Sequence, residues 1–221
     1  MNPYSDRRLF GRPLTIEGNT TAALVIDMLN DFCDEQGKLG NSAALELCES
    51  QNLVLDAARR GGGTVVFVNE QHRVNLEPKR EFAKQMTHTY EGSWGARVVE
   101  PLVVQDTDIE VVKRRYSGFF QSDLDLVLRD RGVTTVVLMG VLTNICVRAT
   151  AHDAFFLGYD VVVPTDTVRS MTPMEQHASL YDISTHFGWV TTSDEVCAAL
   201  ASGSPIMNQM MEPTVPASTA L

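Results

Sequence analysis

Residues 134–146 read Thr-Thr-Val-Val-Leu-Met-Gly-Val-Leu-Thr-Asn-Ile-Cys, and this stretch decides the fold. The apolar run Val136–Met139 follows two threonines, and its length and β-branched content predict a buried strand. The strand ends at Gly140, and apolar residues at helical spacing follow within a few positions, up to a stop at Gly158. A buried strand that leads through a glycine into a helix is typical of an α/β protein.

Cys146 occupies a chemically distinctive place in this unit, because it falls in the first turn of the predicted helix. The unpaired backbone N–H groups and the positive end of the helix dipole favour a thiolate there. The same groups can hold the negative oxygen of a tetrahedral intermediate. Two interpretations stay open at this point: a nucleophile, or a buried cysteine that only packs.

Strands and helices alternate along the rest of the chain. Strands are predicted at residues 22–26, 64–68, 109–112, 136–139, 159–163 and 189–191, and helices at 42–60, 122–131, 143–158, 194–201 and from a capping box at 172–175. Residues 70–108 are irregular, with some helical potential at 80–86. The pattern predicts an α/β fold, a three-layer α/β/α domain with a central six-stranded, mostly parallel sheet. We expect a single domain over residues 1–203 and a flexible C-terminal tail over 204–221.

The composition excludes several classes of protein. The 221 residues carry a formal net charge of −10, whereas nucleic-acid binding needs a basic face. No apolar run approaches the roughly 18 residues of a membrane span, and the polar N-terminus lacks the apolar stretch of a secretion signal. The four cysteines form no Cys-x-x-Cys pair, which favours reduced thiols and a cytoplasmic location.

Three predicted strands end in reactive side chains, namely Asp27, Lys113 and Cys146. The carboxyl ends of parallel strands meet at one edge of a sheet, where α/β proteins place their sites. Ionisable groups that continue buried strands are expected to pair or to shift their pKa. A carboxylate, an ammonium and a thiol at one edge would supply a base, a cation and a nucleophile. Taken one at a time, each also has a structural interpretation. Asp27 could cap a loop, Lys113 could be the first solvated residue after a strand, and Cys146 could pack in the core.

Three motifs resemble the signatures of the isochorismatase-like cysteine hydrolases. They are Leu-Val-Ile-Asp-Met-Leu-Asn-Asp-Phe at 24–32, Val-Lys-Arg-Arg-Tyr-Ser-Gly-Phe at 112–119, and Gly-Val-Leu-Thr-Asn-Ile-Cys at 140–146. The resemblance spans roughly residues 20–195 in the right order, and three motifs together are far more specific than one. It implies a Rossmann-like, isochorismatase-like hydrolase fold with Asp27, Lys113 and Cys146 as the catalytic triad.

The resemblance also implies a particular backbone conformation at the site. A non-proline cis peptide bond is expected between Val141 and Leu142. It would turn the N–H of Leu142 toward the substrate oxygen, beside the N–H of Cys146, so that these two groups form the oxyanion hole.

The family includes isochorismatases, nicotinamidases and hydrolases of ureido compounds such as N-carbamoylsarcosine, ureidoacrylate and biuret. The presence of Cys146 favours hydrolysis of a C–N bond, and the residues around 113–120, 92–96 and 186–188 look more like the ureide branch. We therefore expect an amidohydrolase that cleaves a small linear amide or ureide of the biuret, triuret or N-carbamoyl type. It would release ammonia through an acyl- or carbamoyl-cysteine. The alternatives are a nicotinamidase- or maleamate-type amidase and an isochorismatase-type hydrolase.

Several further side chains are candidates for substrate binding, although each also fits a structural role. They are Phe32, His72, Trp94, Tyr116, Phe119 and Arg115. Aromatic rings could line a small pocket or fill the core. Arg115 could hold a substrate carboxylate or could lie in solvent or in an ion pair.

No metal and no cofactor are expected. The metal-bearing relatives carry an aspartate and histidines after the second strand, whereas this chain has Glu70 and His72 there, with His88 well away in the sequence. Two ligands without a third are weak evidence for a metal site. The glycine cluster at 61–63 precedes a strand, so no phosphate loop is predicted, and no resolving cysteine lies near Cys146 for redox chemistry.

Assembly into a homo-oligomer, a tetramer in particular, is expected. The irregular segment 70–108 carries Phe82, Met86, Tyr90 and Trp94 with no evident strand–helix unit to bury them. Apolar side chains of this kind often mark interfaces. Tetramers are also common among the ureide-hydrolysing relatives.

Overall fold

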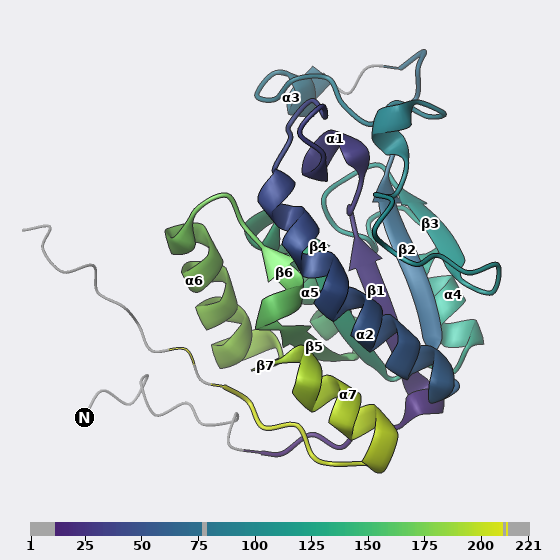
Figure 1. The fold of residues 1–221 in the computed structure, drawn as a ribbon, viewed down its shortest axis with the longest axis vertical. Coiled ribbons are helices and arrows are strands. Elements are labelled where there is room, and N and C mark those ends of the chain that lie inside the picture. Colours follow the sequence, from purple (N-terminus) through teal and green to yellow (C-terminus); the bar gives the residue numbers. More distant parts are fainter. Residues whose placement is uncertain (1–11, 77–78, 210, 212–221) are drawn as a thin grey trace, which may run out of the picture.

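A parallel sheet forms the centre of the protein, in a computed structural model that describes residues 12–76, 79–209 and 211. The seven-stranded sheet has the order β3-β2-β1-β4-β5-β7, and β6 pairs with β4 beyond this path (Figure 1). Each pair of neighbouring strands in this sheet is parallel. The strands are β1 Thr21–Ile26, β2 Thr64–Glu70, β3 Ile109–Lys113, β4 Thr135–Val141, β5 Asp160–Pro164, β6 Val168–Arg169 and β7 Trp189–Thr191.

Helices cover both faces of the sheet, which confirms the predicted three-layer α/β/α architecture. They are α1 Asn30–Cys33, α2 Cys48–Arg60, α3 Lys79–Phe82, α4 Leu124–Asp130, α5 Arg148–Phe156, α6 Pro173–Asp182 and α7 Ser193–Ser202. Helices α2 and α7 pack side by side on one face, in front of the sheet in Figure 1. Helices α4, α5 and α6 contribute to the core on the other face.

The alternation of side chains in β1 shows how the sequence builds two cores. All six residues of β1 are buried, as expected for a strand with neighbours and helices on both sides. Ala23 and Val25 pack in the core beneath α2 and α7, whereas Leu24 and Ile26 pack in the core of the opposite face. Such a strand needs apolar residues at every position, which is why an unbroken apolar run marks it in the sequence.

The structure corrects several predicted elements. The two-residue strand β6 was not predicted, so the sheet has seven strands and not six. The helix expected at 42–60 begins as a 3-10 helix, Ser42–Leu47, before α2. The helix expected at 143–158 begins with a π-helical turn, Thr143–Val147, before α5. The capping box that opens α6 is confirmed, because Thr172 accepts from the N–H of Glu175 and Glu175 accepts from the N–H of Thr172.

The first residues of the expected tail do not extend freely from the body. Ile206 is fully buried, and it exchanges two backbone hydrogen bonds with Leu14, of 2.9 and 2.8 Å. The Asn208 side chain accepts from the N–H of Val190 at 2.8 Å. The prediction of a flexible tail is therefore wrong for residues 204–209, and 210 and 212–221 lie outside the described residues.

The α-helices of the described ranges are short, and α2 has 13 residues. None of them combines the length and the apolar composition that a membrane crossing requires.

Candidate active site

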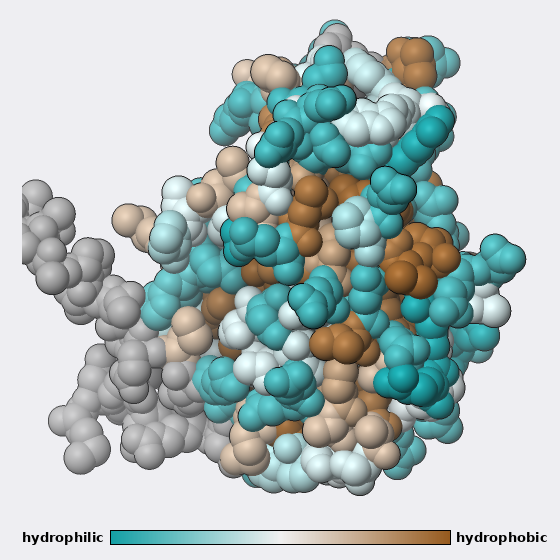
Figure 2. Space-filling view, viewed as in Figure 1, coloured by the Kyte–Doolittle hydropathy of each residue, from teal (hydrophilic) through white to brown (hydrophobic). Residues whose placement is uncertain are grey.

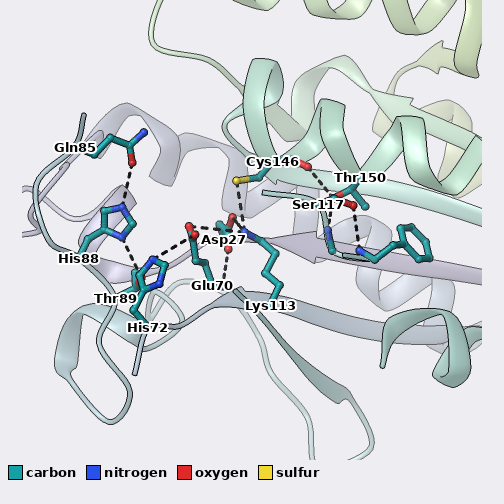
Figure 3. A network of polar contacts seen from close by, with 12 residues as sticks. Asp27, Glu70, His72, Gln85, His88, Thr89, Lys113, Ser117, Cys146 and Thr150 are labelled. Atoms are coloured by element: carbon teal, nitrogen blue, oxygen red, sulfur yellow. Dashed lines mark hydrogen bonds and ion pairs between the residues drawn. The ribbon is translucent and has the colours of Figure 1, made fainter. Parts of the chain in front are cut away.

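The three reactive strand ends converge at one edge of the sheet (Figure 3). Asp27 directly follows β1, Lys113 is the last residue of β3, and Cys146 lies in the π-helical turn after β4. The Lys113 ammonium lies 2.8 Å from Asp27 Oδ2 and donates to the Cys146 sulfur at 3.5 Å. The structure thus brings together the three residues that the sequence singled out.

Lys113 is the centre of this cluster and is fully buried. Its Nζ also lies 3.8 Å from Glu70 Oε2, so one ammonium faces two carboxylates and a thiol. Burial opposes the charge, but Asp27, Cys146 and Glu70 together raise the pKa of Lys113. Lys113 is therefore a permanent cation.

The pKa of the Asp27 carboxyl group differs from its ordinary value. Burial raises its pKa to about 6, against the attraction of Lys113, and the charge of Glu70 raises it further. Its Oδ1 accepts the backbone N–H of Glu70 at 2.7 Å, which fixes the carboxylate between β1 and β2. A carboxylate with this pKa can accept and return a proton near neutral pH.

The thiol of Cys146 differs from the expectation drawn from its helix position. Burial raises its pKa well above the ordinary value, and the opposing attraction of Lys113 is the smaller effect. At this site burial therefore outweighs the influence of the helix start and of Lys113, and it favours the thiol form of Cys146. A base is needed to remove the proton, and Asp27 lies within 4.8 Å of the sulfur.

A second set of contacts fixes the backbone around the nucleophile. The Thr150 hydroxyl donates to the carbonyl of Cys146 at 2.7 Å and accepts the N–H of Gly118 at 2.9 Å (Figure 3). The loop that follows Lys113 is thus tied to the helix that carries Cys146. The peptide bond between Val141 and Leu142 is cis, as the resemblance implies.

Glu70 belongs to the same cluster, although the sequence analysis considered it only as a metal ligand. Its side chain is buried at the end of β2. Burial works against its ionisation, but Lys113 and His72 lower its pKa to about 2, so Glu70 is a carboxylate. The signal available in the sequence was the place of Glu70 at the end of a strand next to the strand of Asp27.

His88 reaches the active site from a distant position in the chain. One ligand atom each of Glu70, His72 and His88 lies within 4.8 Å of the others. The expectation of two potential ligands without a third is therefore wrong for the folded chain. Both ring nitrogens of His88 are engaged, however. Nδ1 lies 3.1 Å from the Thr89 hydroxyl, and Nε2 lies 3.1 Å from Gln85 Oε1 (Figure 3).

The remaining two groups of this set are paired with each other. His72 Nε2 and Glu70 Oε1 have no hydrogen-bond partner within the described part of the chain, and they face each other at 3.4 Å. Glu70 is also attracted by Lys113. Binding of a divalent cation by this set would break a contact of His88 and would compete with Lys113 for Glu70.

A cavity of about 190 Å³ opens above the thiol. Twelve side chains line it: Asp27, Phe32, Leu39, Asn41, Glu70, Gln85, Tyr116, Val141, Leu142, Ile145, Cys146 and Met171. Most of these are apolar, and the reactive groups Asp27, Glu70 and Cys146 all belong to the lining. A small substrate in this cavity would contact the nucleophile directly.

The structure places the predicted substrate-binding residues in two groups. Phe32 and Tyr116 line the cavity, whereas Trp94, Phe119 and Arg115 are not among the lining residues. Phe119 stacks on Tyr159 and packs against the core, and Trp94 is 43% exposed. His72 is also not among the lining residues, and its ring lies beside the carboxylate of Glu70. Leu39, Asn41, Gln85 and Met171 were missed, because loop residues give no periodic signal.

The chain is similar to known proteins in sequence. Residues 21–195 match the model of the Isochorismatase domain. The ureidoacrylate amidohydrolase RutB of Stutzerimonas stutzeri is 33% identical over 219 residues, with 88% of each chain covered.

Two solved structures are also similar. A cysteine hydrolase from Pseudomonas syringae pv. phaseolicola has a TM-score of 0.81 and 28% identity, over 89% of this chain and 99% of that one. The N-carbamoylsarcosine amidase of Thermoplasma acidophilum has a TM-score of 0.69 and 31% identity, over 79% of this chain and 97% of that one.

Proposed function

Since this chain belongs to the isochorismatase family, we propose that it hydrolyses a small linear amide or ureide through a covalent intermediate on Cys146. The chain is an amidohydrolase of this family that acts on C–N bonds in linear amides, and its relatives point to a ureide-type substrate. Within that class, compounds of the biuret, triuret or N-carbamoyl type are our candidates.

One observation carries the proposal. The Lys113 ammonium lies 2.8 Å from a carboxylate and 3.5 Å from a thiol, beside a cavity of about 190 Å³ that reaches the same carboxylate and thiol. A base, a cation and a nucleophile thus share one small, mostly apolar space. This arrangement is typical of nucleophilic catalysis.

The first half of the reaction forms the covalent intermediate. Asp27 takes the proton of the Cys146 thiol, and the sulfur attacks the carbonyl carbon. The negative oxygen that results is stabilised by the backbone N–H groups of Leu142 and Cys146. The C–N bond then breaks, the proton passes from Asp27 to the leaving nitrogen, and ammonia departs.

The second half releases the product. Asp27 is again a carboxylate, and it takes a proton from a water molecule, whose oxygen attacks the thioester-like carbonyl. The C–S bond breaks and the sulfur regains the proton from Asp27. Lys113 remains charged throughout, because its pKa is raised, and it stabilises the thiolate and the carboxylate in turn.

The test combines a substrate panel with a nucleophile variant. Ammonia release is measured with biuret, ureidoacrylate, N-carbamoylsarcosine, maleamate and nicotinamide, and the best substrate is mixed with enzyme and quenched for mass spectrometry. We expect a mass increase on the peptide that contains Cys146, and a loss of orders of magnitude in turnover for Cys146→Ser with the fold intact. Near-normal turnover in that variant would contradict the proposal.

Two further properties belong to the same proposal. We place the enzyme in the cytoplasm, since the mechanism needs a reduced Cys146 and all four cysteines are free thiols. We also propose that the enzyme is a homotetramer.

A further inference from the structure

The cavity above Cys146 lacks a feature that an anionic substrate would need. Within the described residues, no arginine, lysine or histidine is among its lining side chains. The wall is formed by six apolar residues, Phe32, Leu39, Val141, Leu142, Ile145 and Met171, and its polar groups away from the reaction centre are the uncharged Asn41, Gln85 and Tyr116. The far end of a substrate would therefore meet hydrocarbon and neutral dipoles.

The charges near the cavity also disfavour an anionic substrate. Two carboxylates, Asp27 and Glu70, belong to the lining, and the ammonium that faces them is that of the buried Lys113. That ammonium is already shared between both carboxylates and the Cys146 sulfur. It is not available to a second anion at the far end of the substrate.

Two arginines close to the site in the sequence have partners elsewhere. Arg114 binds the carboxylate of Glu91 and the carbonyl of Gln71. Arg169, two residues before Met171, binds Glu46 at 2.9 Å. Each guanidinium already has a partner outside the cavity.

From this lining we infer that the substrate is an amide or ureide whose remaining part is uncharged, and that substrates with a carboxylate there are rejected. The inference rests on the proposed function and makes its substrate class narrower. It also separates this chain from its relatives, since ureidoacrylate, the compound in their name, carries a carboxylate. Burying such a group without a cation to pair with it is strongly unfavourable.

A pair of ureas with the same heavy-atom skeleton tests the inference. In 3-ureidopropionate the chain ends in a carboxylate, and in isopentylurea the carboxylate is replaced by an isopropyl group of similar shape. We expect kcat/KM for isopentylurea to be about a hundredfold higher or more, since a pocket without matching polar groups rejects the charged analogue. Equal values, or a preference for 3-ureidopropionate, would overturn the inference.

A charge placed at the mouth of the cavity gives an independent readout. Met171 lines the cavity and is 58% exposed, so Met171→Arg adds a cation without disturbing the core. We expect this variant to reduce the preference for isopentylurea by at least tenfold. The matched control is Met174→Arg, because Met174 is 72% exposed and lies outside the lining, and it should leave the preference unchanged. An unchanged preference in Met171→Arg would count against the inference.

Binding separates this inference from the proposed reaction. Calorimetry with Cys146→Ala, which cannot form the intermediate, measures the affinity of both ureas without turnover. Tighter binding of isopentylurea supports the inference even if the wild type cleaves neither urea, a result that would contradict the proposed function alone. Tighter binding of 3-ureidopropionate, or no binding of either compound, overturns the inference and leaves the covalent mechanism to the Cys146→Ser test.

Discussion

At the scale of single residues, burial determines the chemistry of the site more strongly than helix position does. The helix start favours a thiolate at Cys146, but burial raises the pKa of the thiol and outweighs the opposing attraction of Lys113. The identities of Asp27, Lys113 and Cys146 could be predicted, because each continues a strand. Their protonation states could not, because these depend on Glu70, which approaches from another strand.

The first prediction concerns the acid limb of the pH profile. The pKa of Asp27 is about 6, mainly through burial, and the charge of Glu70 contributes to the increase. If the carboxylate is the active form, kcat/KM falls as the pH drops below about 6. Glu70→Gln removes a negative charge, which lowers the pKa of Asp27 and moves the acid limb to lower pH. If Glu70→Gln unfolds at the normal temperature and the acid limb of its pH profile does not move, Glu70 does not raise the pKa of Asp27.

The second prediction concerns Lys113. Its loss leaves Asp27 and Glu70 as buried carboxylates without a cation, so Lys113→Ala should lower the free energy of unfolding by about 3 kcal/mol or more. The attraction that favours the thiolate disappears as well, and the pKa of Cys146 should rise further. Iodoacetamide labelling at several pH values measures the second effect and denaturant unfolding the first. An unchanged labelling profile would argue against the assignment.

At the scale of elements, strands were predicted better than the turns between them. An apolar run such as that of β4 is sufficient to mark a buried strand, whatever follows it. The two-residue strand β6 and the π-helical turn Thr143–Val147 leave no such pattern. Both depend on pairing with β4 or on packing against it, and local sequence does not encode these contacts.

The third prediction concerns the end of β4, where Gly140 has a φ of 114°. A Cβ at this position would lie 2.0 Å from the carbonyl oxygen of Ile26, so Gly140→Ala should cost about 3 kcal/mol or more. Gly132 is the matched control, since its φ is 68° and a Cβ added there would have no neighbouring atom within 4 Å. Gly132→Ala should cost only about 1 kcal/mol. Thermal unfolding of both variants checks the difference, and similar losses would contradict the steric argument.

At the scale of the whole molecule, the exposed apolar surface supports assembly. The segment 70–108 is less open than the sequence predicted, because Phe82 packs its ring against His72, His88 and Tyr90. Trp94 and Met86 are nevertheless 43% and 57% exposed. Figure 2 shows further hydrophobic surface near β3. In the segment that precedes β3, Val103 and Val104 are exposed by 50% and 55%.

The fourth prediction is the oligomeric state. Light scattering coupled to size exclusion at micromolar concentration should give a mass close to four times 24.4 kDa. Trp94→Glu should shift the mass toward smaller species, since it places a charge on the exposed apolar segment. Leu126→Glu, on α4 and 63% exposed, is the control that should leave the mass unchanged. A wild-type mass near 24.4 kDa would mean a monomer.

The fifth prediction is independence from metals. Both ring nitrogens of His88 are engaged and Glu70 faces Lys113, and a thiol nucleophile needs no Lewis acid. Activity should survive dialysis against EDTA, and elemental analysis should find far less than one zinc or iron per chain. Loss of activity on chelation, with recovery on addition of a metal, would favour the nicotinamidase alternative.

The bridge between Leu14 and Ile206 has a mechanical consequence. The two segments are antiparallel, so a force applied at residues 12 and 209 acts on the same end of the bridge and loads its two hydrogen bonds one after the other. Hydrogen bonds that are loaded one at a time break at a lower force than hydrogen bonds that share the load. Stretching the chain from these points would first break the contacts of Asn208 and Gln209 with Val190, which exposes the edge of the sheet at β7, and would then open the bridge. The strands that carry Asp27, Lys113 and Cys146 would still be unloaded.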